Sequence, residues 1–412
     1  MTHIDTTAPL PSLQDLLDPR HQADPYPLYS RWRTHAPVAR IDEQLMVLSR
    51  YEDCAAVLRD ARFGHAEADD PRFTGERARP ASKVLVDDDG RPVRGFLNLN
   101  PPDHTRMRSL VSQAFTRRRV EGLTPRIEEL ATELFTALES AEGPVDLIED
   151  LATPLPVAVI SELLGVPAAD RHRMLEWSHA VARALVPDFL LPPGAAEQEA
   201  QAWREFTDHL RGLVAERRRS PGDDLLSALV AVHDDGDALT ENELLATCTL
   251  LLIAGHETTV NLIGNGTLAL LRHPDQLDRL RSDPDLIAPA VEELLRYDSP
   301  VQLVARFALQ DAEVAEVPVE RGTTLLLLTG AANRDPAAYD HPDRLDVGRA
   351  PRHLSFGHGI HFCLGAPLAR LETQIVLALL LRRAPNLRLA GAPRWKDHIT
   401  LRGLSRLPLS LG

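Results

Sequence analysis

The chain has 412 residues, a formal net charge of −15 and three cysteines. The acidic balance argues against nucleic acid as a partner, and so few cysteines argue against a disulfide scaffold and for a reducing compartment. Because the N-terminus lacks the features of a signal peptide and no apolar run approaches the ~20 residues of a membrane-spanning helix, we expect a cytoplasmic protein that does not contact a membrane.

Helical patterns dominate the first half of the chain. Ser49 is a candidate N-cap for a helix over 51–59, and another helix begins near Pro102 with Pro and Asp in its first turn. Between them, residues 60–100 are charged and rich in Asp, Pro and Gly, which indicates a long loop. Further helices are expected at about 124–141, 149–164 and 168–186 and, after a Pro-rich break at 187–194, up to about Arg219.

The second half contains one long helical pattern, at about 241–272. At about 1.5 Å per residue it would extend roughly 45 Å and cross the molecule, and its apolar middle indicates burial. Shorter helices follow as far as Tyr297, residues 302–328 form short β-like runs, and a last helix is expected from Cys363 to about Arg383. The fold class is therefore mainly α, with a small β region concentrated after residue 300. No linker or repeat divides the chain, so residues 1–412 are expected to form a single domain.

Residues 356–365 read Phe-Gly-His-Gly-Ile-His-Phe-Cys-Leu-Gly, and we refer to them as the cysteine loop. Cys363 lies at the start of a helical pattern, where backbone N–H groups and the helix N-terminus favour a thiolate. A thiolate in a loop that can approach a flat cofactor suits iron ligation. The alternatives are a buried structural cysteine or part of a zinc site, although no second cysteine lies nearby.

The middle of the long helix reads Ala-Gly-His-Glu-Thr-Thr at 254–259. A glycine, an acid and hydroxyls are poor choices for an apolar helix interior, and threonine can bond back to a carbonyl and bend the helix. One interpretation is a kink with a solvated Glu257. The other is a proton relay formed by Glu257 and Thr258, since general acid catalysis needs such groups at hydrogen-bond reach.

Two further pairs share a helix face. Glu293 and Arg296 are three residues apart, and spacing alone suggests a surface ion pair worth under about 1 kcal/mol. His104 and Arg108 are four residues apart. Their donors would suit a carboxylate, although such a pair is more often solvated surface.

These motifs together resemble those of the cytochrome P-450 family, in its order and spacing and over nearly the whole chain. The resemblance implies the α-rich fold of that family, with a long central helix across the haem and minor antiparallel sheets. It implies haem b (iron protoporphyrin IX) as the cofactor and Cys363 as its iron ligand, a thiolate that favours O–O cleavage. By the same resemblance Phe356 shields the sulfur, Gly357 and Gly359 permit tight turns, and Gly365 lets the backbone approach the ring.

The resemblance also assigns the other motifs. Thr258 would hold oxygen and a water while Glu257 passes protons inward, which favours O₂ activation. Glu293 and Arg296 would form a structural pair that joins the core to the irregular segment 333–352. The remaining haem contacts implied by the resemblance are the propionate partners His104, Arg108, Arg306 and His361, and Ala254 and Gly255 on the long helix.

The substrate-contact regions of the family correspond to apolar positions in this chain, and such a lining suits a hydrophobic organic molecule. Ordinary loop packing is the alternative, and residues 187–194 could form a lid. The expected pocket residues are Val84, Leu85, Phe96, Leu97, Phe189, Leu250, Ile253, Ala254, Leu303, Val304, Thr400 and Leu401.

The resemblance is to soluble bacterial, actinomycete-type enzymes that tailor macrolides and other secondary metabolites. It implies a haem-thiolate monooxygenase that hydroxylates or epoxidises such a molecule with O₂. Because the chain has no flavin or iron–sulfur motif, electrons from NAD(P)H would arrive through a ferredoxin reductase and a ferredoxin. Candidate docking residues are Arg106, Arg117, Arg118, Arg352 and Arg370.

Other outcomes stay open at this point. The same haem chemistry could serve oxidative coupling, desaturation or aromatisation, which the motifs do not separate. A non-catalytic haem sensor or carrier is a further alternative, but it has no need of the Glu257–Thr258 pair.

Overall fold

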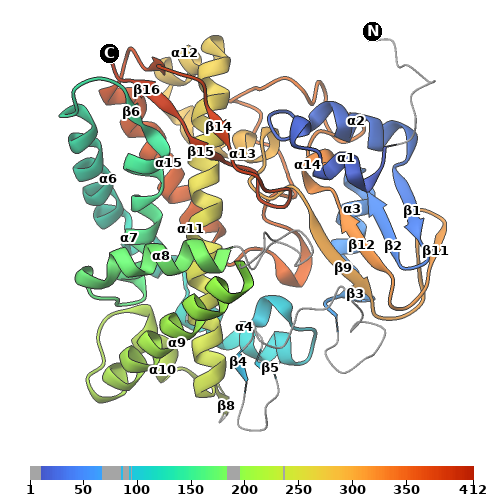
Figure 1. Cartoon of the computed structure of the whole chain (residues 1–412), viewed down its shortest axis with the longest axis horizontal. Coiled ribbons are helices and arrows are strands. Elements are labelled where there is room, and N and C mark those ends of the chain that lie inside the picture. The colour runs from blue at the N-terminus through green and yellow to red at the C-terminus, as the bar shows by residue number, and fades with distance from the viewer. Residues whose placement is uncertain (1–10, 67–84, 87–91, 94, 183–194, 235–236) are drawn as a thin grey trace.

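The computed structural model describes residues 11–66, 85–86, 92–93, 95–182, 195–234 and 237–412. Helices dominate, and α11 (Glu241–Arg272) runs through the middle of the helical part (Figure 1). Its N-terminus is fixed by a capping box, in which Thr240 Oγ1 accepts from Glu243 N at 3.3 Å and Glu243 Oε2 accepts from Thr240 N at 2.9 Å. The predicted mainly α fold class and the bounds predicted for the long helix are confirmed.

The largest core cluster joins α11 to its neighbours α6 (Thr124–Glu139), α7 (Pro154–Leu163), α9 (Ala195–Arg219), α10 (Leu225–Ala231) and α15 (Ala366–Arg383). The other helices in the described part of the chain are α1 (Leu13–Leu17), α2 (Tyr26–His35), α3 (Tyr51–Arg59), α4 (Asp103–Ala114), α5 (Arg117–Gly122), α8 (Arg171–Ala182), α12 (Pro274–Ser282), α13 (Ile287–Tyr297) and α14 (Thr329–Ala332). None of the helices in these ranges is long and apolar enough to span a bilayer.

A five-stranded sheet lies to one side of the helices that surround α11, together with α1, α2, α3 and α14 (Figure 1). Its strand order is β1 (Val38–Asp42), β2 (Leu45–Leu48), β12 (Thr324–Leu327), β9 (Val304–Ala308) and β3 (Phe63–Gly64). The β structure was expected to be concentrated after residue 300, but β1, β2 and β3 of this sheet all lie before residue 65. One ladder also departs from the antiparallel pattern, because β2 and β12 pair in parallel. The four residues of β2 are all buried, as a strand covered on both faces requires.

The remaining strands form small antiparallel pairs and one three-stranded sheet. The hairpin of β14 (Arg394–Trp395) and β15 (Leu404–Arg406) packs beside α11, and a Cβ on Gly403 would lie only 1.8 Å from Asn261 Oδ1. The other strands are β4 (Leu85–Val86), β5 (Pro92–Val93), β6 (Val145–Asp146), β7 (His233–Asp234), β8 (Asp237–Ala238), β10 (Ala312–Val314), β11 (Val317–Val319), β13 (Arg388–Leu389) and β16 (Pro408–Ser410).

Some predicted boundaries were wrong for local reasons. Ser49 does not cap α3, since its Oγ donates to Pro37 O at 3.3 Å, and the N–H of Tyr51 is bound instead by Asp335 Oδ2 at 2.8 Å. The last helix begins at Ala366 rather than at Cys363. Before α7, residues 148–152 form a π-helical turn. The predicted break at 187–194 lies outside the described residues.

Candidate functional site

The cysteine loop is a tight structure closed by backbone hydrogen bonds. Cys363 N donates to Phe356 O at 2.9 Å. Gly357 and Gly359 have φ values of 71° and 69°, in the left-handed region that favours glycine. A Cβ on Gly359 would also lie 2.5 Å from Leu58 O at the end of α3. The loop therefore requires glycine at both positions and holds the cysteine at one place.

Cys363 is a half-buried free thiol with opposing influences on its charge. Burial raises the pKa of the Cys363 thiol, whereas the N–H of Gly365, the Arg108 guanidinium, the N–H of Ala366 and Arg370 lower it. The expected help from the helix N-terminus is present, but burial outweighs it. In this environment the thiolate is best stabilised by direct ligation to a metal, which displaces the proton.

Buried nitrogen donors gather beside the loop. The centroid of the His361 ring lies 4.3 Å from that of His104 on α4 and 4.7 Å from that of His65. Burial, with the charges of Arg306, His104 and Arg108, lowers the pKa of His361 to about 3. The four residues predicted to contact propionates thus lie in one cluster, and His65 joins them.

The cluster of His104, Arg306 and His361 contains more hydrogen-bond donors than acceptors. Arg306 on β9 is 6% exposed, and its Nη1 donates a hydrogen bond to the adjacent Ala305 O at 2.8 Å. Burial lowers the pKa of Arg306 to about 10. Both ring nitrogens of His104 and of His361 are buried without a hydrogen-bond partner among the described residues. Since buried polar groups are normally satisfied, the cluster fits the carboxylates of a buried cofactor.

His65 was missed by sequence reasoning. Its backbone is held by Asn100, whose Oδ1 accepts from His65 N and whose Nδ2 donates to His65 O, both at 2.8 Å. Since it lies in a charged loop with no periodicity, no local pattern marks it.

The middle of α11 presents two different faces. Ala254 is exposed and Gly255 and Thr258 are half-buried, whereas His256 and Glu257 are buried. Thr258 Oγ1 donates to Ala254 O at 3.0 Å, which is the back-bond that the sequence suggested. The hydroxyl of Thr258 therefore lies on the open face of the helix.

Glu257 is 8% exposed, so the alternative of a solvated glutamate in a kink was wrong. Lys396 Nζ, from the segment after β14, donates to Glu257 Oε1 at 2.5 Å and to Asn261 Oδ1 at 3.1 Å. Sequence reasoning missed Lys396 as a functional residue. The available signal was its rarity, because Lys83 and Lys396 are the only lysines among 45 basic residues.

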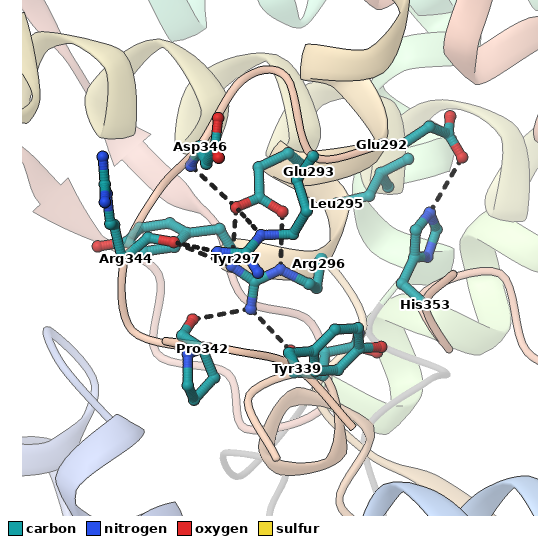
Figure 2. Close-up of polar contacts among 12 residues, drawn as sticks. Glu292, Glu293, Leu295, Arg296, Tyr297, Tyr339, Pro342, Arg344, Asp346 and His353 are labelled. Atoms are coloured by element: carbon teal, nitrogen blue, oxygen red, sulfur yellow. Dashed lines mark hydrogen bonds and ion pairs between the residues drawn. The ribbon is translucent and has the colours of Figure 1, made fainter. Parts of the chain in front are cut away.

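Glu293 and Arg296 on α13 form a fully buried pair rather than a surface one (Figure 2). Arg296 Nε donates to Glu293 Oε2 at 2.7 Å and Nη2 donates to Oε1 at 2.8 Å. Two parallel bonds of this kind fix both charge and orientation.

The same pair reaches into the irregular segment 333–352. Glu293 Oε1 accepts from Asp346 N at 3.0 Å and from Arg349 Nε at 3.1 Å. Arg296 donates to the carbonyls of Asn333, Pro342 and Arg344 at 3.0, 2.8 and 3.3 Å. The pair therefore joins α13 to this segment.

The expected docking arginines are only partly available. Arg370 donates to Glu292 Oε1 at 2.6 Å and lies over the Phe356 ring, 4.6 Å from its centroid. Arg106 pairs with Glu243, and Arg117 pairs with Glu121 at 2.7 Å. Arg118 and Arg352 are exposed, and so are the apolar side chains of Ile360 and Phe362 in the cysteine loop.

The expected pocket residues form two groups in the described part of the chain. Segment 95–97 lies against α11, since a Cβ on Gly95 would be 3.2 Å from Leu250 Cδ2. Residues 301–304 lie beside 400–401, because Gln302 N donates to Thr400 O at 2.8 Å and Val301 bridges with Leu401.

The exposure of these positions also varies. Phe96 and Leu401 are buried, Ala254 is exposed, and the half-buried members are Leu97, Leu250, Leu303, Val304 and Thr400. Val84 and Phe189 lie outside the described residues, as do the side chains of Leu85 and Ile253.

Comparisons with known proteins identify the family of the chain. The family model "Cytochrome P450" matches residues 44–384. The 6-deoxyerythronolide B hydroxylase of Saccharopolyspora erythraea is 40% identical over 97% of this chain and 99% of its own length. The cytochrome P450 monooxygenase PikC of Streptomyces venezuelae is 42% identical over 99% and 96%. The solved structure of the bacillaene polyketide synthase cytochrome P450 PksS of Bacillus subtilis has a TM-score of 0.84 at 40% identity, over 96% of this chain and 99% of that one.

Proposed function

The chain belongs to the cytochrome P450 family, and from this membership we propose that it hydroxylates or epoxidises a hydrophobic secondary metabolite of the polyketide class. Membership makes it a monooxygenase that carries a haem iron, takes electrons from a redox partner and acts on a small molecule. We further infer that the haem is haem b, that the electrons come from a ferredoxin and its reductase, and that residues 1–412 form one domain. The observation that carries the proposal is the Glu257–Thr258 pair of α11, in which a buried carboxyl is followed by a hydroxyl on the open face of the helix.

The residues present fit haem b. Cys363 would ligate the iron, with Phe356, Gly357 and Gly365 around the sulfur. The unpartnered ring nitrogens of His104 and His361, together with the guanidinium groups of Arg108 and Arg306, suit two propionates. Ala254 and Gly255 would lie against the ring. The bound haem supplies the activation of O₂ by a thiolate-ligated iron.

The protein side of the reaction is proton delivery. Glu257 can take up a proton at its carboxylate and pass it toward the open face of the helix. Thr258 can hold a water and donate at Oγ1 once the hydroxyl turns away from Ala254 O. Both groups are carried by one rigid helix, which keeps the carboxyl group of Glu257 and the hydroxyl of Thr258 in a fixed relative position.

The substrate class is proposed from two arguments. The expected pocket positions are apolar, which suits a hydrophobic molecule. The similar proteins include one named for polyketide biosynthesis and one named for the hydroxylation of 6-deoxyerythronolide B. Macrolide aglycones are therefore the first compounds to test.

For the redox partner we propose the face around the cysteine loop. Exposed Ile360 and Phe362 offer an apolar centre, and Arg118 and Arg352 offer positive charge for an acidic ferredoxin. Because steering by exposed charges is screened, electron transfer should slow as ionic strength rises.

The test combines spectroscopy with product analysis. The reduced CO complex should have a Soret band far to the red of histidine-ligated haem, and Cys363→Ser should abolish that band. Macrolide aglycones should give a type I spectral shift, and turnover under ¹⁸O₂ should place one labelled oxygen in the product. An unlabelled product would instead favour coupling or desaturation, and a band that survives Cys363→Ser would refute the assigned ligand.

A further inference from the structure

Lys396 forms a three-membered polar group with two residues of α11. Its Nζ donates to Glu257 Oε1 at 2.5 Å and to Asn261 Oδ1 at 3.1 Å. Glu257 and Asn261 are four residues apart, so both face the β14–β15 hairpin. Lys396 N in turn donates to Gly403 O at 3.0 Å, which anchors the base of the side chain in that hairpin.

Packing leaves little room for other arrangements here. Asn261 is fully buried, and the backbone of Gly403 approaches its Oδ1 so closely that a Cβ would lie 1.8 Å away. The hairpin therefore presses on α11 at the position where Lys396 binds. A compact ammonium with three rotatable donors can bond two oxygens from one point, whereas a planar guanidinium needs a fork of space.

Lysine at this position contrasts with the rest of the chain, which uses arginine for nearly all its basic residues. The side chain of Lys396 is 22% exposed and that of Glu257 is 10% exposed. Lys396 is thus the more exposed partner of the pair. Two of its three N–H groups are bound within the protein, which leaves one for water.

Among the described residues, two histidines are further ionisable groups near Glu257. His256 Nε2 on α11 lies 3.9 Å from Glu257 Oε2. His398 follows Lys396 by two residues, and its Nδ1 accepts from Thr400 N at 3.2 Å and from Leu401 N at 3.0 Å. Burial lowers the pKa of His398, so neither its charge nor its bonded Nδ1 replaces the ammonium as a partner of the acid.

We propose that Lys396 is a positioning residue for the proton relay. Its ammonium is shared between Glu257 and Asn261 and holds the Glu257 carboxylate at the outer side of α11. There the carboxylate takes up protons from water before it passes them toward Thr258. Lys396 keeps its own proton throughout. When Glu257 turns toward Thr258, the ammonium stays bound to Asn261 Oδ1 and the pair reforms afterwards. This inference rests on the proposed monooxygenase function.

The first experiment tests the contact itself and needs no turnover. Lysine labelled with ¹³C and ¹⁵N in the side chain gives two side-chain signals in the diamagnetic reduced CO complex, because the chain has two lysines. Lys83→Arg assigns them. Glu257→Gln should shift the Lys396 signal and leave that of Lys83 unchanged. An unshifted Lys396 signal would overturn the proposal, whether or not the protein turns over a substrate.

The second experiment tests the role. Lys396→Met should keep the reduced CO band but raise the peroxide released per electron pair several-fold and increase the solvent isotope effect on product formation. Lys396→Arg should recover part of the coupling, because it retains the cation. Arg394→Met removes an exposed charge from the same hairpin and should behave as the wild type. Wild-type coupling in Lys396→Met would overturn the proposal. A normal shift in the first experiment with no monooxygenation by the wild type would refute the proposed function instead.

Discussion

The rings of His104 and His361 lie with their centroids 4.3 Å apart, one on α4 and the other in the cysteine loop. Neither ring has a hydrogen-bond partner among the described residues, and the His361 ring lies near the charges of Arg306 and Arg108. Donors brought together in this way are stabilised by an anion that accepts from them.

Arg306→Gln should therefore weaken haem retention. A lost charge-assisted bond is worth about 1.5–3 kcal/mol, which corresponds to roughly ten- to hundredfold weaker binding. The measurement is the extent of haem transfer to an excess of a scavenger apoprotein. Arg388→Gln, an exposed arginine on β13, is the control and should retain haem as the wild type does. Equal retention in both variants would show that Arg306 does not contact the cofactor.

Glu293→Gln should lower the free energy of unfolding by about 3–5 kcal/mol, because it leaves the buried Arg296 without its carboxylate. Denaturant unfolding at equal haem content measures the loss. Asp208→Asn is the control, because Asp208 and Arg211 have the same spacing and a 2.7 Å contact but are exposed. That change should cost under about 1 kcal/mol. Similar losses in the two variants would contradict a special role for the buried pair.

Stability should depend on pH through Glu372 on α15. This carboxyl is 1% exposed, and burial raises its pKa to about 8. Its folded pKa lies above the unfolded value of 4.5, so the folded state binds more protons and stability is fully present below about pH 4.5. It is then lost as pH rises through about 8.

Glu372→Gln removes this titration. The variant should gain about 1–3 kcal/mol relative to the wild type at pH values above 8 and little near pH 4.5. Chemical unfolding of both proteins across this pH range gives the comparison. A difference between them that does not vary with pH would count against a neutral buried carboxyl.

Thr258→Ala should keep the haem and the reduced CO band but release peroxide in place of most of the product, since the relay loses its hydroxyl. Reductant consumed, peroxide and product are measured together. Thr259→Ala is the matched control, because Thr259 bonds Gly255 O at 3.1 Å in the same way but is buried. Fully coupled turnover in Thr258→Ala would argue against the relay.

Local signals were sufficient for much of the fold. The bounds of α11 were predicted because its periodicity runs to Arg272, just before His273 and Pro274. By contrast, β2 was missed because four consecutive apolar residues do not distinguish a buried strand from a piece of helix.

The residues of the candidate site also fall into those that local sequence predicts and those that it does not. Motif spacing predicted roles for Cys363 and for the Glu257–Thr258 pair. For Glu293 and Arg296, spacing alone suggested a surface pair, whereas the family resemblance implied a structural pair joined to the segment 333–352. Their burial depends on carbonyls of the segment 333–352, which are distant in sequence. The contact of Lys396 with Glu257 is also set by tertiary packing, so no spacing rule could reveal it.

The parallel pairing of β2 with β12 affects the order in which the molecule can form during synthesis. Residues 45–48 leave the ribosome long before residues 324–327, and at about 5–20 residues per second the interval is on the order of 15–60 s. Throughout that time the apolar strand Leu45–Leu48 has only β1 as a sheet partner. Completion of this sheet is therefore a late event, and a nascent chain halted before Thr324 would expose an unpaired edge that chaperones or proteases could recognise.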